Sequence, residues 1–133
     1  MSITETNTQV ALSLLDAFTA GDVDKIVSLL ADDATWWAAG SVPGVSGSRT
    51  KAEVTTAVAG MADLSVTGTL PTTIHRTIAQ GDLVAIEAST DARFTNGKTY
   101  QNQYMFLIRV RDGEIVEIKE YMDTELARST FLG

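Results

Sequence analysis

Hydrophobic positions in the first part of the chain recur at helical spacing. Leu14 and Phe18 share one helix face, and Gly21 follows where a helix commonly ends. A second apolar stripe covers residues 23–30 and starts directly after Asp22, a residue type that caps helix N-termini. The pattern therefore predicts two helices before the first strand.

The next segment combines a short apolar stretch, a loop and the start of a third helix. Residues 34–39 have the character of a strand, and residues 40–48 are rich in Gly and Ser, which is typical of a loop. Thr50 then precedes Glu53 at the spacing of a capping box. We therefore predict that a third helix begins at Thr50.

Alternating apolar and polar positions replace the helical spacing from Ser65 onward. The pattern predicts four strands, at residues 65–79, 82–95, 98–111 and 113–122. The short glycine-containing separators between them leave room only for antiparallel hairpins. Helices followed by such strands predict a single α+β domain over residues 1–133, with the helices packed on one face of a curved antiparallel sheet.

The last two predicted strands carry polar side chains on an otherwise apolar face. Period-two alternation places Asn102 and Tyr104 on that face, and on the next strand it places Glu120 between Ile118 and Met122. A buried polar group costs free energy unless it is paired. An amide, a phenol and a carboxylate on one inner face therefore indicate a pocket with a polar cluster.

Composition narrows the class of protein. The chain has 133 residues, of which 44% are hydrophobic and 20% charged, as in ordinary globular domains. No apolar run approaches the ~20 residues of a membrane-spanning helix, so no membrane partner is expected. The net charge of −7 and the scattered basic residues argue against a nucleic-acid partner. The absence of cysteine and of a signal-like N-terminus favours a cytoplasmic location.

The sequence contains no pattern that indicates a metal or another cofactor. His75 is the only histidine, and one histidine cannot build a metal site alone. Its neighbours Ile74 and Ile78 are expected to face inward, which turns His75 outward. The adjacent acids Asp32 and Asp33 are better explained by capping at helix starts and turns than by metal binding. We therefore expect neither a metal nor a cofactor.

This order of elements resembles the SnoaL-like branch of the NTF2-like superfamily. The resemblance includes Ala-Asp-Asp-Ala-Thr-Trp at residues 31–36 and Glu-Tyr-Met-Asp at residues 120–123, and it covers nearly the whole chain. Members include polyketide cyclases, ketosteroid isomerases and limonene epoxide hydrolase. The resemblance implies a cone in which a curved sheet wraps a helix, with a ligand pocket at the open end. It implies no single chemistry, because this scaffold hosts many functions.

The match to the epoxide hydrolase breaks down at that enzyme's polar residues. Its five polar positions correspond to Trp36, Ala38, Ala88, Thr90 and Glu120, so only the last keeps a carboxylate. Water activation by its Asp–Arg–Asp arrangement therefore cannot operate here. The cyclases resemble this chain through an acidic pocket residue, for which Glu120 is the nearest candidate.

The resemblance also implies a set of ligand contacts. Trp36, one of two consecutive tryptophans, would form a flat wall for a planar ligand. Plain core packing explains such an apolar set equally well. The other residues expected to bind the ligand are Phe18, Met61, Ala62, Val66, Ala88, Thr90, Ala92 and Met122.

Glu120 is the candidate general base or acid. A carboxylate between apolar neighbours is desolvated, which raises its pKa toward the range useful for proton transfer. Tyr104 and Asn102 are candidate catalytic donors to a developing oxyanion. Two alternatives stay open: a one-residue register shift that exposes Glu120 and turns Tyr121 inward, or a structural hydrogen bond from Glu120 to Tyr104 or Asn102.

Two classes of function follow from this pocket. One is a cofactor-independent isomerase or cyclase that acts on an apolar small molecule. The other is a non-catalytic ligand-binding or interaction domain, as many NTF2-like proteins are.

The opposite face of the sheet is predicted to form a homodimer. Parity places Met105, Leu107, Ile115 and Tyr121 there, and this cluster is too apolar for a solvent face. An isologous contact between two copies is the commonest way to cover such a face. The alternative is that residues 125–133 fold back and cover the cluster within one chain.

Overall fold

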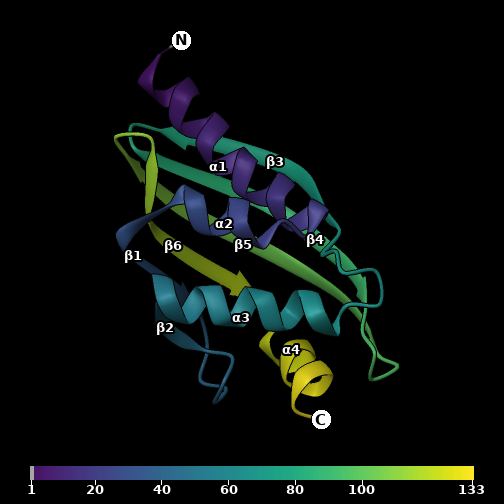
Figure 1. The fold of residues 1–133 in the computed structure, drawn as a ribbon. Helices are drawn as coiled ribbons and strands as arrows, with labels where there is room; N and C mark the ends of the chain where they lie inside the picture. The colour runs from purple at the N-terminus through teal and green to yellow at the C-terminus, as the bar shows by residue number, and fades with distance from the viewer. Residues whose placement is uncertain (1) are drawn as a thin grey trace.

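The computed structural model describes residues 2–133 as helices packed against one six-stranded sheet. In chain order the elements are α1 (Ile3–Ala20), α2 (Val23–Leu29), β1 (Leu30–Ala38), β2 (Gly47–Thr50), α3 (Lys51–Leu64), β3 (Thr72–Gln80), β4 (Leu83–Arg93), β5 (Thr99–Arg111), β6 (Glu114–Met122) and α4 (Thr124–Phe131). The strands are hydrogen-bonded in the order β2-β1-β6-β5-β4-β3. In Figure 1 the helices α1, α2 and α3 lie in front of the curved sheet. This α+β arrangement confirms the predicted fold class.

The helix ends follow the capping residues in the sequence. At the start of α2, Asp22 Oδ1 accepts a hydrogen bond from the Lys25 backbone N–H at 3.1 Å. Thr50 and Glu53 form the predicted capping box at the start of α3. Gly21 ends α1 in the left-handed conformation, with a φ of 68°. No helix in the described part of the chain is long and apolar enough to cross a membrane.

The sheet is mixed, which corrects the prediction of a wholly antiparallel one. The hairpins β3–β4, β4–β5 and β5–β6 are antiparallel as predicted. However, β1 pairs in parallel with β6, so that Trp36 lies opposite Ile118 and Ala38 lies opposite Glu120. A parallel pair cannot be closed by a hairpin, and here the whole segment from β2 to β5 connects the two strands.

Register shifts in two strands change which side chains face inward. In β6 a shift turns Ile115 into the core, where it is fully buried, although parity predicted it on the outer face. In β3 a shift after Ile74 has the opposite effect and leaves Ile78 66% exposed, so its predicted inward position was wrong. His75 faces outward as predicted, with its Nε2 2.8 Å from Ser89 Oγ.

The C-terminal residues form α4, a helix that the sequence analysis did not predict. Asp123 caps it by accepting a hydrogen bond from the Leu126 backbone N–H at 3.1 Å. The Phe131 ring packs on the inner side of the sheet, 5.1 Å from the centroid of Tyr100. The alternative in which residues 125–133 cover the outer face was therefore wrong, because this helix packs on the opposite side.

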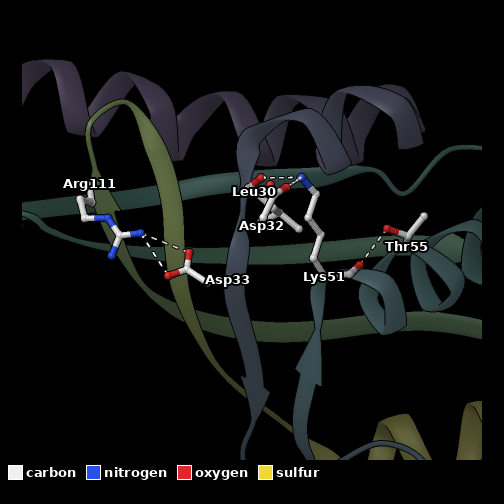
Figure 2. Close-up of polar contacts among 6 residues, drawn as sticks. All are labelled: Leu30, Asp32, Asp33, Lys51, Thr55 and Arg111. Carbon is white, nitrogen blue, oxygen red and sulfur yellow. Dashed lines mark hydrogen bonds and ion pairs between the residues drawn. The ribbon is translucent and has the colours of Figure 1, made fainter.

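Charged side chains anchor the start of β1, as Figure 2 shows. Lys51 Nζ donates a hydrogen bond to the Leu30 carbonyl at 2.9 Å and lies 3.3 Å from Asp32 Oδ1. Arg111 Nη2 lies 3.2 Å from both carboxylate oxygens of Asp33. The two adjacent acids therefore form ion pairs instead of the predicted caps. Exposed pairs of this kind contribute at most about 1 kcal/mol each.

Gly21 allows the turn between α1 and α2 to approach the segment before β3. A Cβ atom at this position would lie 2.1 Å from the carbonyl oxygen of Gly68, far inside van der Waals contact. Close by, the Leu70 backbone N–H donates to the Phe18 carbonyl at 3.1 Å. This contact fixes the end of α1, and with it Phe18, over the sheet.

We expect Gly21→Ala to destabilise the protein by at least about 3 kcal/mol, since it combines left-handed strain with a backbone clash. Gly113→Ala is the matched control, because Gly113 has a similar φ of 79° but open space around its Cβ position. It should cost only the strain, about 1–2 kcal/mol. Urea unfolding of both variants measures the difference, and equal losses would contradict the close contact with Gly68.

Candidate functional site

A cavity of about 270 Å³ lies between the inner face of the sheet and the helices α1, α3 and α4. Its wall includes the buried side chains of Leu15 and Tyr100 as well as the exposed residues Gly44 and Leu132, so the cavity reaches the surface. This volume suits a ligand of one or two rings. Most of the wall is apolar and includes Val54, Val58, Met61, Phe106, Met122 and Phe131.

The structure places most of the expected ligand contacts on this wall, but not all of them. The wall contains Phe18, Trp36, Met61, Thr90, Ala92, Met122, Tyr104 and Glu120. Four expected residues lie elsewhere: Ala62, Val66, Ala88 and Asn102.

Local geometry explains three of the four exceptions. Val66 is 63% exposed because α3 has already ended and the chain turns outward. Ala62 follows Met61 on α3, and successive helix residues point about 100° apart. Ala88 lies directly opposite Tyr104 and is completely buried, with no side chain beyond its methyl group to reach the cavity.

Glu120 reaches the cavity from the inner face of β6, so neither a register shift nor Tyr121 replaces it. Its Oε2 accepts a hydrogen bond from Trp36 Nε1 at 3.0 Å. The part of the Glu120 side chain that remains exposed faces the cavity, so the carboxyl group is largely removed from bulk water. This burial raises the pKa of Glu120 to about 7, although the Trp36 hydrogen bond and the charge of Arg49 oppose the shift.

Asn102 holds the backbone together and does not reach a ligand. Its Nδ2 donates to the Asp123 carbonyl at 3.0 Å, and its Oδ1 accepts from the Asp123 backbone N–H at 3.1 Å. Nδ2 also donates its second hydrogen to the Tyr100 hydroxyl, at a distance of 2.8 Å. Both amide hydrogens are therefore committed within the protein, which corrects the expectation that Asn102 donates directly to an oxyanion.

Two phenols connect Asn102 to the cavity. The Tyr100 and Tyr104 hydroxyl oxygens lie 2.5 Å apart, and either one can donate. Because Tyr100 accepts a hydrogen bond from Asn102, it can donate its own hydrogen bond to Tyr104. The Tyr104 hydroxyl is then free to donate to a ligand. In the other arrangement Tyr100 donates to Met122 Sδ at 3.7 Å, a weaker acceptor than oxygen.

Both phenols are held in their protonated form. Burial raises the pKa of Tyr100 to about 12, against the opposing hydrogen bonds from Tyr104 and Asn102. Burial, followed by the charge of Glu120, raises the pKa of Tyr104 well above its usual value. Near Tyr104, the buried Thr90 Oγ1 has no hydrogen-bond partner in the described part of the chain. The nearby Thr90 hydroxyl lowers the pKa of Tyr104 against the effect of burial, although the two hydroxyl groups do not form a hydrogen bond.

The polar groups of the cavity fall on one diagonal of the sheet. Trp36 lies opposite Ile118, which is two residues before Glu120 on β6. Glu120 in turn lies opposite Phe106, which is two residues after Tyr104 on β5. Tyr104 pairs with Ala88, two residues from Thr90. Diagonal neighbours of this kind are about 7–8 Å apart. A ligand that lies along the floor can therefore contact a carboxyl group at one point and hydroxyl groups at the next.

Three parts of the site were not predicted from the sequence. Tyr100 shares strand parity with Tyr104, a signal that was available in the alternation of β5. Arg49 lies on β2, a four-residue strand that begins in the predicted loop and ends where the third helix was predicted to start. Phe131 and Leu132 line the cavity from the end of the unpredicted α4, for which Asp123 was the available capping signal.

The described residues contain no group of three His, Asp or Glu side chains close enough to hold a metal ion. The polar groups contributed by the cavity wall are a carboxyl group with a raised pKa, a pair of phenols, the Thr90 hydroxyl and one guanidinium.

Three solved structures show what this chain is similar to. An NTF2-like protein from Burkholderia xenovorans LB400 shares 25% identity with a TM-score of 0.74, over 96% of this chain and 97% of that one. An LEH-like epoxide hydrolase from M. tuberculosis shares 21% identity with a TM-score of 0.76, over 98% and 92%. IdmH from Streptomyces antibioticus, a candidate polyketide cyclase, shares 21% identity with a TM-score of 0.74, over 92% and 96%. The last two show the fold alone.

Sequence comparison identifies the family. No curated protein matches the chain. The family model of the SnoaL-like domain matches residues 11–118, a range that runs from α1 into β6 and confirms the resemblance seen in the sequence. The chain therefore belongs to the SnoaL-like domain family and has the NTF2-like fold.

Proposed function

We propose that the protein is a cofactor-independent isomerase or cyclase that moves a proton on an apolar carbonyl compound. One observation carries the proposal: the Glu120 carboxyl group opens into an apolar cavity with Trp36 Nε1 as its one hydrogen-bond partner among the described residues. With a pKa of about 7, this group exchanges a proton easily near neutral pH. The hydroxyl of Tyr104 lies on the same wall, one diagonal step away.

The proposed reaction needs no external reactant. The Glu120 carboxylate takes a proton from the carbon next to the substrate carbonyl, and the C–H electrons form an enolate whose charge rests on oxygen. The Tyr104 hydroxyl donates a hydrogen bond to that oxygen, and its buried setting strengthens the bond. In an isomerase, Glu120 returns the proton to another carbon. In a cyclase, the enolate carbon attacks a second carbonyl and Glu120 protonates the resulting alkoxide.

Epoxide hydrolysis of the Asp–Arg–Asp type does not fit this wall. The β4 positions that would carry two of its polar groups are Ala88, which is fully buried, and Thr90, which carries no charge. Glu120 alone cannot supply both a base and an acid for water attack on an epoxide.

A second candidate function is ligand binding without catalysis. The observation that favours it is the composition of the wall, which is apolar apart from a few groups and provides shape more than chemistry. In that case Glu120 and Tyr104 would orient a bound carbonyl compound without transferring its proton.

Proton exchange on a bicyclic ketone distinguishes the two functions. We expect the wild-type protein to accelerate deuterium exchange at the α-carbon of 2-tetralone in D₂O, followed by NMR. Glu120→Gln keeps an acceptor for Trp36 but removes the base, so the rate should fall about 10²–10⁴-fold. Tyr104→Phe should give a smaller loss. His75→Gln, on the outer face, is the control and should exchange at the wild-type rate. A wild-type rate no faster than buffer would support binding alone.

The protonation of Glu120 gives a second prediction. The pKa of Glu120 is raised from an ordinary value of 4.5 to about 7, so folding favours its protonated form. Its contribution to stability is full below pH 4.5 and is lost as the pH rises through about 7, by roughly 3 kcal/mol in all. NMR titration of the carboxyl carbon should give the raised pKa, and urea unfolding of Glu120→Gln should lack this loss. A normal pKa would contradict the desolvated carboxyl group.

We also propose that two copies of the chain dimerise through the outer face of the sheet. Trp37, Met105, Leu107 and Tyr121 form an outer-face cluster, in which Met105 and Tyr121 are 42% and 43% exposed. The Trp37 and Tyr121 rings pack edge to face, 5.5 Å apart. Since α4 packs on the inner face, no described element of the chain covers this cluster. A second copy would bury it in an isologous contact.

Sedimentation velocity at micromolar concentration tests this contact. The wild-type protein should sediment as a dimer, and Leu107→Lys should be monomeric because it places a charge in the desolvated centre of the interface. Ile3→Lys is the control, because Ile3 is also an exposed apolar residue (68%) but lies on α1. A monomeric wild-type protein would rule out the dimer, and a dimeric Leu107→Lys variant would move the interface elsewhere.

A further inference from the structure

The wall of the cavity includes one cation, Arg49. This residue lies on β2 directly opposite Trp36, so its side chain shares the inner face of the sheet with the floor of the cavity. It is half-buried and hydrogen-bonded to the exposed residue Gly44, which places the guanidinium near the opening. Glu120 is the only other charged residue of the wall.

Backbone carbonyls hold the guanidinium, and no described carboxylate lies within ion-pair distance of it. The pKa of Glu53 is lowered by its hydrogen bonds with Thr50 and also by the charge of Arg49, but that exposed carboxylate is bonded in the capping box of α3. Arg49 Nη2 donates to the Gly44 carbonyl at 2.8 Å, and Nη1 donates to the Val45 carbonyl at 3.1 Å. Arginine has five N–H donors in a planar fork. Across residues 2–133 no other hydrogen bond and no ion pair to Arg49 is present, so three donors stay available in a fixed orientation.

The missing partner is unusual for this chain. It has 17 acidic and 10 basic residues, and four of its six arginines (Arg76, Arg109, Arg111 and Arg128) form ion pairs with these acids. Among the described residues the two arginines without a pair are Arg49 and Arg93, and Arg93 is exposed at the end of β4, where water solvates it. A half-buried guanidinium without a counter-ion is costly, which favours an anion supplied from outside the protein.

Glu120 is not that counter-ion, because no ion pair or hydrogen bond joins it to Arg49 in the described part of the chain. Between Arg49 and Glu120 lies β1, so their strands are separated by two strand spacings, about 10 Å. The charge of Arg49 nevertheless reaches Glu120 and lowers the pKa of that carboxyl group against the effect of burial. The space between the two groups belongs to the cavity, with the indole ring of Trp36 beneath it.

We propose that Arg49 binds a carboxylate of the ligand, so that the substrate is an apolar carbonyl compound that also carries an acid group. The apolar body lies over Trp36, the carbonyl end lies near Glu120 and Tyr104, and the carboxylate stays near the opening. The proposal rests on the proposed function for the carbonyl end, but the binding of the acid group by Arg49 is independent of any proton transfer.

Two probes of the same shape test this recognition: 2-naphthylacetate and its neutral isostere 2-naphthylacetamide. Isothermal titration of the wild-type protein should show at least tenfold tighter binding of the acid. Arg49→Gln should lose this preference while its Kd for the amide stays within twofold of wild type, and Arg49→Lys should keep part of it. Arg93→Gln removes the other unpaired arginine and should leave the preference unchanged.

The outcomes separate this inference from the proposed function. Equal affinity of the wild-type protein for both probes would overturn it. Equal weakening of both probes by Arg49→Gln would do so as well, because it would mean that Arg49 only holds the loop at Gly44 and Val45. If 2-tetralone exchange fails but the acid preference persists and depends on Arg49, the proposed catalysis is wrong and the carboxylate site stands.

Discussion

The parallel pairing of β1 with β6 is the constraint on which the site depends. It joins segments more than 80 residues apart and sets Trp36 beside Ile118, so that the indole N–H meets Glu120 at 3.0 Å. β2 attaches to β1, so Arg49 enters the cavity wall only because this pairing exists. The antiparallel hairpins from β3 to β6 would by themselves give an inner face with the carboxyl group and the phenols but without the wall opposite them.

The interior balances polar function against the cost of burial. Asn102 forms hydrogen bonds with both backbone groups of Asp123, as a neighbouring strand would. It donates its remaining amide hydrogen to the Tyr100 hydroxyl. Each polar group behind the wall is therefore paired, which keeps the cost of burial low. On the wall itself the pairing is incomplete, since within residues 2–133 Thr90 Oγ1 has no partner and Glu120 has one. Unpaired capacity concentrated at one cavity is the arrangement expected of a binding site rather than a core.

The sequence predicted those features that depend on local chemistry. Capping residues located the end of α1 and the starts of α2 and α3, and alternation placed Tyr104 and Glu120 on the inner face. Features that depend on distant pairing were not predictable. A four-residue β2 has no pattern of its own, so nothing in the sequence marked Arg49 between the predicted loop and the predicted helix. The register shift that buries Ile115 can be recognised only when the pairing of β6 with β5 is known. Asn102 fits both a catalytic donor and a structural bridge until its partners are known.

The anchoring of α4 has a consequence for how a ligand is accommodated. The helix begins at the residue after Asp123, whose backbone Asn102 holds on both sides, so no slack linker precedes it. Its far end is tied to the β4–β5 hairpin, where Lys98 Nζ donates to the Ser129 carbonyl at 2.6 Å and Asn96 Nδ2 to the Thr130 carbonyl at 3.0 Å. Hydrogen bonds at both ends restrain this helix against hinging. The α4 part of the wall therefore has its shape in the empty cavity, and a molecule that entered would lose little ordering entropy there.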